Sequence, residues 1–292
     1  MKRAAMMVAM LGISVWSLGQ STNKPATPSG QTTPAAGQAA PAAGQTAAAP
    51  QGKRPPAAKT KEEFDAYKAA AALTEPAAQE KAADDFATKF PDSELRGLLY
   101  KTAMAGYQQA NNADKMLELA RKALTFDPDD PTALVGVAQV LAERTHDTDL
   151  DKDQRLAEAK KDAQRALVTV DTDVPTTGYS PEQINAFKGF LRSEAYSIVG
   201  TIEFNTKAWA DAEMDLRKSI DALPQQVDPV AVLRLSLALD QQKKYAEALK
   251  YANQAVELTQ ATTSAGKAAR EEKDRLTQLN SGTAPGTNPA PK

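Results

Sequence analysis

The acidic segment from Asp147 to Glu158 has the spacing of a calcium-binding loop. Its carboxylates fall at the first, third, fifth, seventh and twelfth places of such a loop: Asp147, Asp149, Asp151, Asp153 and Glu158. The sixth place requires glycine for a sharp turn, but it holds Lys152, whose β-carbon resists the turn and whose charge opposes a cation. Two interpretations stay open: a calcium site, or an acidic loop whose aspartates help to start the following helix.

The residue types of other common catalytic and metal sites are scarce. The chain has one histidine, His146, and no cysteine, so it can assemble neither a zinc cluster nor a thiol nucleophile. A Ser-His-Asp triad would have to use His146, which lies in the polar segment RTHDTDLDKDQRLAE, where nothing marks a serine as a nucleophile. No glycine-rich phosphate loop follows a strand, and carboxylate pairs are too common to indicate acid–base catalysis. We therefore predict no catalytic residue and no cofactor.

The charge balance argues against a nucleic-acid partner. The chain has 35 Lys and Arg residues against 37 Asp and Glu residues, a net charge of -2. A protein that neutralises a phosphate backbone needs a basic excess or a basic stripe, and the sequence has neither. We expect a protein or peptide as the partner, with no nucleic acid and no small-molecule cofactor.

Residues that bind a partner must be positioned by helices, because residues 60–279 carry no strand signal. Apolar residues recur there every three or four positions. Helix starts are marked by capping boxes at Thr60 with Glu63 and at Ser180 with Gln183, and by aspartate before proline at Asp130 and Asp228. The sequence predicts five helix pairs and a last helix: Lys61 to Leu73 with Ala77 to Phe90; Glu94 to Ala110 with Ala113 to Phe126; Pro131 to Arg144 with Gln154 to Val170; Pro181 to Phe204 with Ala208 to Leu223; Pro229 to Gln242 with Tyr245 to Gln260; and Ser264 to Leu279.

A longer period relates successive pairs. Trp209, Ala212, Leu216 and Ser219 recur 36 residues later as Tyr245, Ala248, Ala252 and Ala255. A helix of about 14 residues is marginal in water, so each helix must bury a face against a neighbour. Small residues allow the two helices of a hairpin to approach closely, and we expect the large rings to fill the wedge between them, which places Trp209 in the core.

The repeated unit resembles the tetratricopeptide repeat. The best match, YSIVGTIEFNTKAWADAEMDLRKSIDALP, has Tyr196, Gly200, Trp209, Ala212 and Pro224 in place, and the resemblance covers most of residues 60–279. The segment ADDFATKFPDSE from Ala83 is similar to a phrase in bacterial outer-membrane assembly and cell-envelope coordination proteins. The resemblance implies an all-α fold: an α-α superhelix of about five helical hairpins with a C-terminal capping helix, over residues 59–279.

The resemblance also implies a concave groove lined by the first helix of each pair. Its polar amides would suit the backbone of an extended peptide or a partner helix, and Leu233 and Leu237 would anchor an apolar side chain. Cations that capture a terminal carboxylate are lacking. The residues at these positions are Lys101, Gln108, Gln109, Gln139, Glu143, Glu194, Thr201, Asn205, Leu233, Leu237, Asp240 and Gln241.

The two ends of the chain differ in composition from the repeats. The first 19 residues, MKRAAMMVAMLGISVWSLG, have the charged, apolar and small-residue order of a secretory signal, with an uncleaved membrane anchor as the alternative. Residues 20–58 are rich in Ala, Pro, Gly and Gln and predict a disordered linker, and residues 280–292 predict a disordered tail. We expect a periplasmic or secreted protein without a membrane span after cleavage, and the lack of cysteine excludes a lipoprotein.

The functional expectation is a non-catalytic protein-interaction scaffold of the bacterial cell envelope. It follows from the repeat spacing, the signal segment and the lack of a catalytic constellation. One alternative is an envelope enzyme, or enzyme subunit, that acts on glycan through groove carboxylates. Another is a purely structural spacer.

Overall fold

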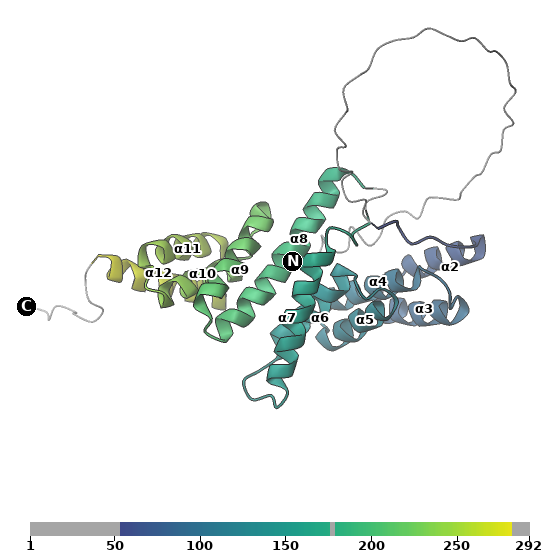
Figure 1. The fold of residues 1–292 in the computed structure, drawn as a ribbon, viewed down its shortest axis with the longest axis horizontal. Helices are drawn as coiled ribbons and strands as arrows, with labels where there is room; N and C mark the ends of the chain where they lie inside the picture. The colour runs from purple at the N-terminus through teal and green to yellow at the C-terminus, as the bar shows by residue number, and fades with distance from the viewer. Residues whose placement is uncertain (1–52, 176–178, 282–292) are drawn as a thin grey trace, which may run out of the picture.

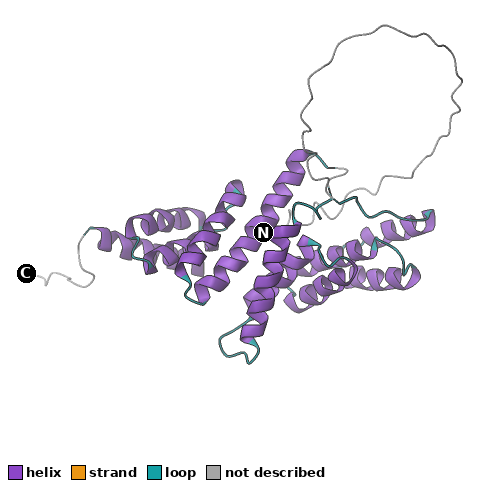
Figure 2. Cartoon of the chain, viewed as in Figure 1, coloured by secondary structure: helices purple, strands orange, loops and turns teal. Residues whose placement is uncertain are grey.

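A computed structural model describes residues 53–175 and 179–281 of the chain, and helices make up all of the regular structure in these residues (Figures 1 and 2). Eleven α-helices and one short 3-10 turn are present there, without a strand. The predicted signal segment, most of the predicted linker, and the tail beyond residue 281 lie outside the described residues. None of the described helices is both long enough and apolar enough to cross a membrane.

The helices form five hairpins and a last helix, which confirms the predicted fold class. The observed ends lie close to the predicted ones. The hairpins are α2 (Lys61–Ala71) with α3 (Pro76–Lys89), α4 (Arg96–Gln109) with α5 (Ala113–Phe126), α6 (Pro131–Arg144) with α7 (Lys152–Thr169), α8 (Pro181–Asn205) with α9 (Trp209–Ala222), and α10 (Pro229–Gln241) with α11 (Tyr245–Leu258); α12 (Ser264–Asn280) follows, and the 3-10 turn η1 (Pro224–Gln226) joins α9 to α10.

Successive hairpins stack into an elongated body that runs from α2 at one end to α12 at the other, with α7 and α8 in the middle (Figure 1). Each helix packs on the next in the chain, and α8 also packs on α6 and on α10. One buried apolar cluster extends from Tyr67 to Leu223, and two smaller clusters join α9 to α12. The molecule is therefore a helical repeat superhelix in which most contacts are between neighbours.

The predicted helix starts are formed by side-chain caps. Thr60 accepts a hydrogen bond from the backbone N–H of Glu63, and Ser180 with Gln183 completes a reciprocal capping box. The carboxylates of Asp130 and Asp228 accept from the first turns of α6 and α10, each of which begins with proline. These caps satisfy N–H groups that have no partner within a helix, so each start is fixed locally.

The repeat extends to the backbone of the hairpin turns. Asn111, Lys207 and Lys243 have φ angles of 57°, 63° and 62°, in the left-handed region that non-glycine residues rarely adopt. Each of the three follows the first helix of its hairpin, and Lys207 and Lys243 are separated by the same 36 positions as the side-chain repeat. The same tight turn therefore reverses the chain in three hairpins.

Small residues set the distance between the helices of a hairpin, as predicted. Ala212 and Ala248 are fully buried at the crossings of the last two hairpins. In α8, a Cβ added to Gly200 would lie 2.8 Å from Cγ of Leu216 on α9. The expectation for Trp209 differs, because its ring is only half-buried and packs edge-on against Phe204, 5.2 Å between ring centroids.

Gly200→Ala should therefore destabilise the protein by roughly 1–3 kcal/mol, because the added methyl group overpacks the α8–α9 contact. Gly97→Ala in α4 is the matched control, since its added Cβ would have its nearest neighbour at 3.7 Å, an ordinary contact. There alanine should be neutral or stabilise the helix by up to about 1 kcal/mol. Chemical denaturation followed by circular dichroism gives both values, and equal stability of the two variants would contradict close helix packing at Gly200.

Candidate functional site

Predicted groove residues from α4 and α6 are joined by hydrogen bonds. The side-chain amide of Gln108 donates to that of Gln139 over 3.3 Å, and Gln139 donates to the carboxylate of Glu143 over 3.0 Å. These side chains are half-buried or exposed, so they form a polar row that a partner can reach. We call the surface made by α4, α6, α8 and α10 the first-helix face, because each of these is the first helix of its hairpin.

Arg234 extends this face to α8 and α10. Its Nη1 donates to the hydroxyl of Thr201 over 3.1 Å, and this is its single hydrogen bond within the described part of the chain. Burial lowers the pKa of the Arg234 guanidinium, although attraction by Asp228 and Glu143 raises it. Within the described residues Arg234 forms no ion pair with either carboxylate, so a half-buried cation keeps most of its N–H groups for another acceptor.

Sequence reasoning missed Arg234 because it lies in the apolar segment PVAVLRLSLALDQ. The repeat register pointed instead to Leu233 and Leu237 on that helix. A lone arginine within an otherwise apolar helix was the available signal, since a charge in such a place is rarely buried without a partner.

Three of the expected groove residues are buried between helices. Lys101 forms an ion pair with Asp130, the capping residue of α6. Asp240 pairs with Arg275 of α12 over 2.6 Å, and Leu233 packs in an apolar cluster that includes α12. In each case a helix further along the chain packs over the side chain, α6 for Lys101 and α12 for Asp240 and Leu233, so these three residues join neighbouring helices.

The remaining expected residues are spread along the face. Gln109, Asn205 and Gln241 are exposed at the C-terminal ends of α4, α8 and α10. Glu194 is half-buried in α8, and Leu237 is half-buried against the same apolar cluster as Leu233. The structure therefore joins Gln108, Gln139 and Glu143 in one row and Thr201 with Arg234 in a second contact, and Glu143 attracts Arg234 from a distance.

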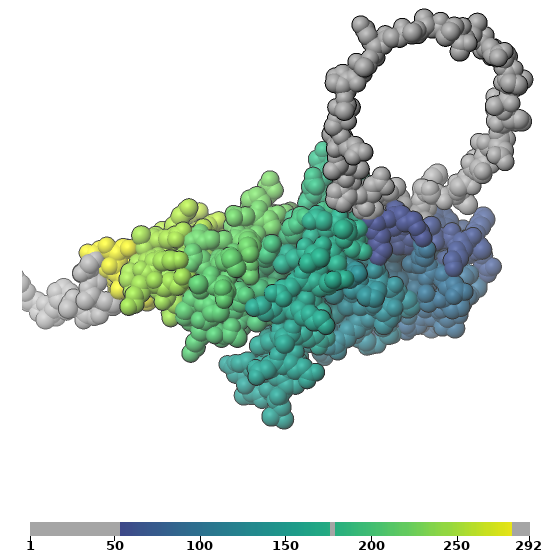
Figure 3. Space-filling model, viewed as in Figure 1, coloured from purple at the N-terminus to yellow at the C-terminus, as the bar shows by residue number. Residues whose placement is uncertain are grey.

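The acidic segment does not gather its carboxylates around one point. Asp147 pairs with Lys152 over 2.6 Å, and Glu158 pairs with Arg121 of α5 over 2.8 Å. Asp149 accepts from the backbone N–H of His146. Among the described residues no group of three or more such ligands could hold a metal ion. The first residues of the segment form the turn between α6 and α7, which projects from the body in Figure 3, and those from Lys152 on belong to α7.

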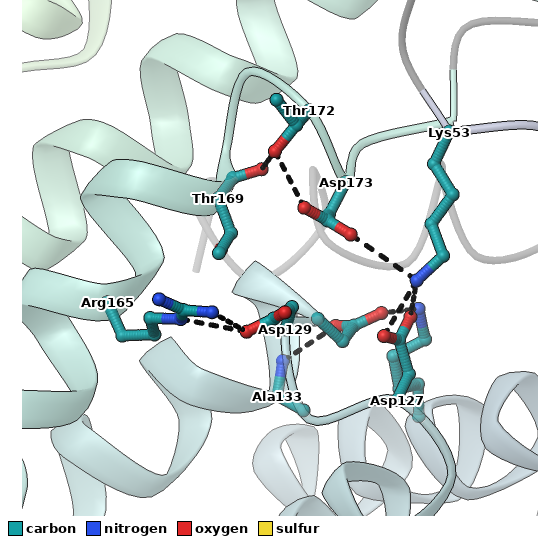
Figure 4. A network of polar contacts seen from close by, with 10 residues as sticks. Lys53, Asp127, Asp129, Ala133, Arg165, Thr169, Thr172 and Asp173 are labelled. Carbon is teal, nitrogen blue, oxygen red and sulfur yellow. Dashed lines mark hydrogen bonds and ion pairs between the residues drawn. The ribbon is translucent and has the colours of Figure 1, made fainter.

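A cavity of about 420 Å³ lies at the start of α4. Its lining includes the Lys101–Asp130 pair, Arg96, and the ring of Phe126, on which the Arg96 guanidinium stacks at 4.5 Å. Lys53, Arg54 and Pro56, which the sequence assigned to the disordered linker, also line this cavity. Lys53 and Arg54 of that segment contact carboxylates of the repeats, as Figure 4 shows for Lys53.

Two buried glutamates have raised pKa values, which is relevant to the alternative of a glycan-acting enzyme. Burial raises the pKa of Glu203, which pairs with Lys160, and of Glu272, which pairs with Arg275. Both lie between packed helices, and the cavity at α4 is lined by neither. The pair of Glu203 with Lys160 joins α8 to α7, whereas the pair of Glu272 with Arg275 lies within α12.

Comparison with protein-family models finds no match to this chain, and comparison with curated proteins finds none either. The resemblance to the tetratricopeptide repeat therefore rests on the sequence pattern alone.

Lys101→Met should destabilise the protein by about 3–5 kcal/mol, because it leaves the buried Asp130 carboxylate without its cation. The double variant Lys101→Met with Asp130→Asn removes both charges, and asparagine still caps α6. We expect the double variant to recover much of the loss in chemical denaturation. If Lys101→Met alone were as stable as the wild type, the pair would not hold α4 to α6.

Proposed function

We propose that this protein is a non-catalytic scaffold that binds a segment of a partner protein on the first-helix face, with Arg234 as the main contact. The single observation that carries the proposal is the half-buried guanidinium of Arg234, which makes one hydrogen bond to the residues that the structure describes, with Thr201 as acceptor. A charge removed from water is costly unless it is paired and hydrogen-bonded. A partner that supplies an acceptor to Arg234 would therefore gain binding free energy.

The ligand chemistry follows from the guanidinium and its neighbours. Arginine has five N–H donors in a planar fork that fits a carboxylate or two carbonyl oxygens. Glu143 and Asp228 attract the same cation from a distance, which disfavours a ligand with high negative charge. A segment with one acidic side chain, or an exposed backbone carbonyl, suits this balance.

The amide row on α4 and α6 supplies the rest of the proposed contact. Gln108 and Gln139 each carry donors and an acceptor, which is what the backbone of an extended segment requires. Their mutual hydrogen bond has a length of 3.3 Å. Replacing this hydrogen bond by hydrogen bonds to a bound segment costs little free energy, because backbone amides of the segment are donors and acceptors equivalent to the side-chain amides.

The proposed setting is the bacterial cell envelope, with the chain exported and the repeats belonging to the tetratricopeptide class. Support comes from the charged and apolar order of the first 19 residues and from the 36-residue repeat. The elongated stack of hairpins is typical of proteins that bind other proteins along an extended surface.

Arg234→Met should reduce partner capture about tenfold or more, because hydrogen bonds to a charged group contribute about 1.5–3 kcal/mol. The wild-type protein and the variant are crosslinked in cell-envelope extract, and the captured proteins are quantified by mass spectrometry. Arg121→Met on α5 is the control, since Arg121 is an exposed arginine on a second helix. Equal capture by all three proteins would count against the proposal, as would capture of no specific partner by the wild type.

The same variant should leave the free protein as stable as the wild type, or slightly more stable. Methionine fills a similar volume without the cost of a buried charge, and only the bond to Thr201 is lost, worth about 1 kcal/mol. Thermal unfolding measures this directly. A loss of more than about 2 kcal/mol would show that Arg234 serves the fold rather than a ligand.

A further inference from the structure

Lys53 binds two separate parts of the superhelix. Its Nζ contacts both carboxylate oxygens of Asp127, which follows α5, at 2.7 Å, and the carboxylate of Asp173, which follows α7, at 3.3 Å (Figure 4). Its backbone N–H donates to the carbonyl of Thr172 over 2.7 Å. The turn after α5 and the loop after α7 are therefore linked through one lysine.

The next residues are held by Glu94, just before α4. Arg54 donates two parallel bonds to the carboxylate of Glu94, at 2.8 and 2.5 Å, in the bidentate geometry that is strong and specific. The same carboxylate accepts from the backbone N–H of Ala57 over 3.3 Å. Arg54 holds the pKa of Glu94 below its usual range, in agreement with this geometry.

The intervening prolines suit an extended segment. Pro55 and Pro56 have no N–H group that would need a partner, and Pro56 lines the cavity at α4. In Figure 1 this segment runs from the middle of the rod to α2 at its end. The contacts of Lys53 therefore place the chain beside the α7–α8 loop before it enters the first hairpin.

These contacts depart from the pattern of the rest of the fold. In a repeat protein each unit contacts its neighbours, yet Lys53 and Asp173 are 120 positions apart. Three carboxylates from three different connecting turns converge on two consecutive basic residues. A linker that served only to join two parts of the chain would not need three carboxylates to bind its basic residues.

We propose that Glu94, Asp127 and Asp173 form a receptor for a basic dipeptide followed by proline, and that residues 53–56 of the chain itself, Lys-Arg-Pro-Pro, occupy it. The receptor holds residues 53–56 at the middle of the rod. The superhelix is therefore attached to the preceding part of the chain at its centre and not at its α2 end. This inference is independent of a partner on the first-helix face, because it involves neither Arg234 nor the amide row.

Charge attraction across partly exposed pairs carries the contact. The side chains of Lys53 and Arg54 are 39% and 69% exposed, so salt should weaken their pairs with the receptor. Docking should therefore depend on ionic strength while the helices stay intact.

The first experiment measures docking in the full chain. The chain has no cysteine, so spin labels can be attached through Gly52→Cys and Lys161→Cys, and their separation measured by double electron–electron resonance. We expect one narrow distance distribution in the wild type. The triple variant Glu94→Gln, Asp127→Asn, Asp173→Asn should give a broad distribution with an unchanged circular dichroism spectrum.

The control neutralises three exposed carboxylates of α2 and α3: Glu62→Gln, Asp65→Asn and Asp85→Asn. This variant loses the same charge and should keep the narrow distribution. A wild-type distribution as broad as that of the triple variant would overturn the proposal, as would a narrow distribution that the triple variant retains.

The second experiment tests the receptor with a separate peptide. A fluorescent peptide of sequence GKRPPAA is added to the full chain carrying Lys53→Gln and Arg54→Gln, and binding is followed by anisotropy. We expect binding at millimolar peptide, at least tenfold weaker in the wild type, whose receptor is filled, and lost when the three receptor carboxylates are also neutralised. Equal binding to all of these chains, or binding to none, would overturn the assignment of a receptor.

Discussion

Close approach of short helices is the constraint on which the rest of the structure depends. Helices of about 14 residues are marginal in water, so each must bury a face. The alanines at the hairpin crossings are fully buried, and Gly200 leaves no space for a side chain opposite Leu216. Two helices packed this closely form a thin layer. Length is then gained by adding hairpins, and the molecule extends as a rod with its functional residues on the surface.

Ion pairs between hairpins fix how each layer sits on the next. Lys101 with Asp130 joins α4 to the start of α6, and Asp240 with Arg275 joins α10 to α12. The lysine and both carboxylates are largely shielded from water, whereas the Arg275 side chain is 42% exposed. Such pairs contribute little net stability, but losing one partner is costly, so they favour one register of stacking. Arg234 occupies a similar position without a carboxylate at contact distance. Unlike Lys101 and Arg275, Arg234 therefore has no carboxylate as an ion-pair partner within the described residues.

The helices could be predicted from sequence because their ends are decided locally. Thr60, Asp130, Ser180 and Asp228 cap their helices with atoms a few residues away. The site was predicted less well, because the environment of a groove residue depends on the following hairpin. Lys101 and Asp240 stand at first-helix positions, but their partners lie in α6 and α12 and cover them. The pattern of a single helix cannot predict which of its residues a later helix will bury.

The contact of Lys53 lies beyond repeat-based prediction for a related reason. The repeat pattern describes interactions between neighbouring units, whereas residues 53–57 lie outside the repeats and bind three turns at once. Composition assigned this segment to a linker, since a stretch of Lys, Arg and Pro offers little apolar surface to bury. Charges and a backbone N–H supply the contacts instead. In a protein whose repeats contact only neighbouring repeats, a segment outside the repeats is the simplest way to fix the chain that precedes the first hairpin to the middle of the rod.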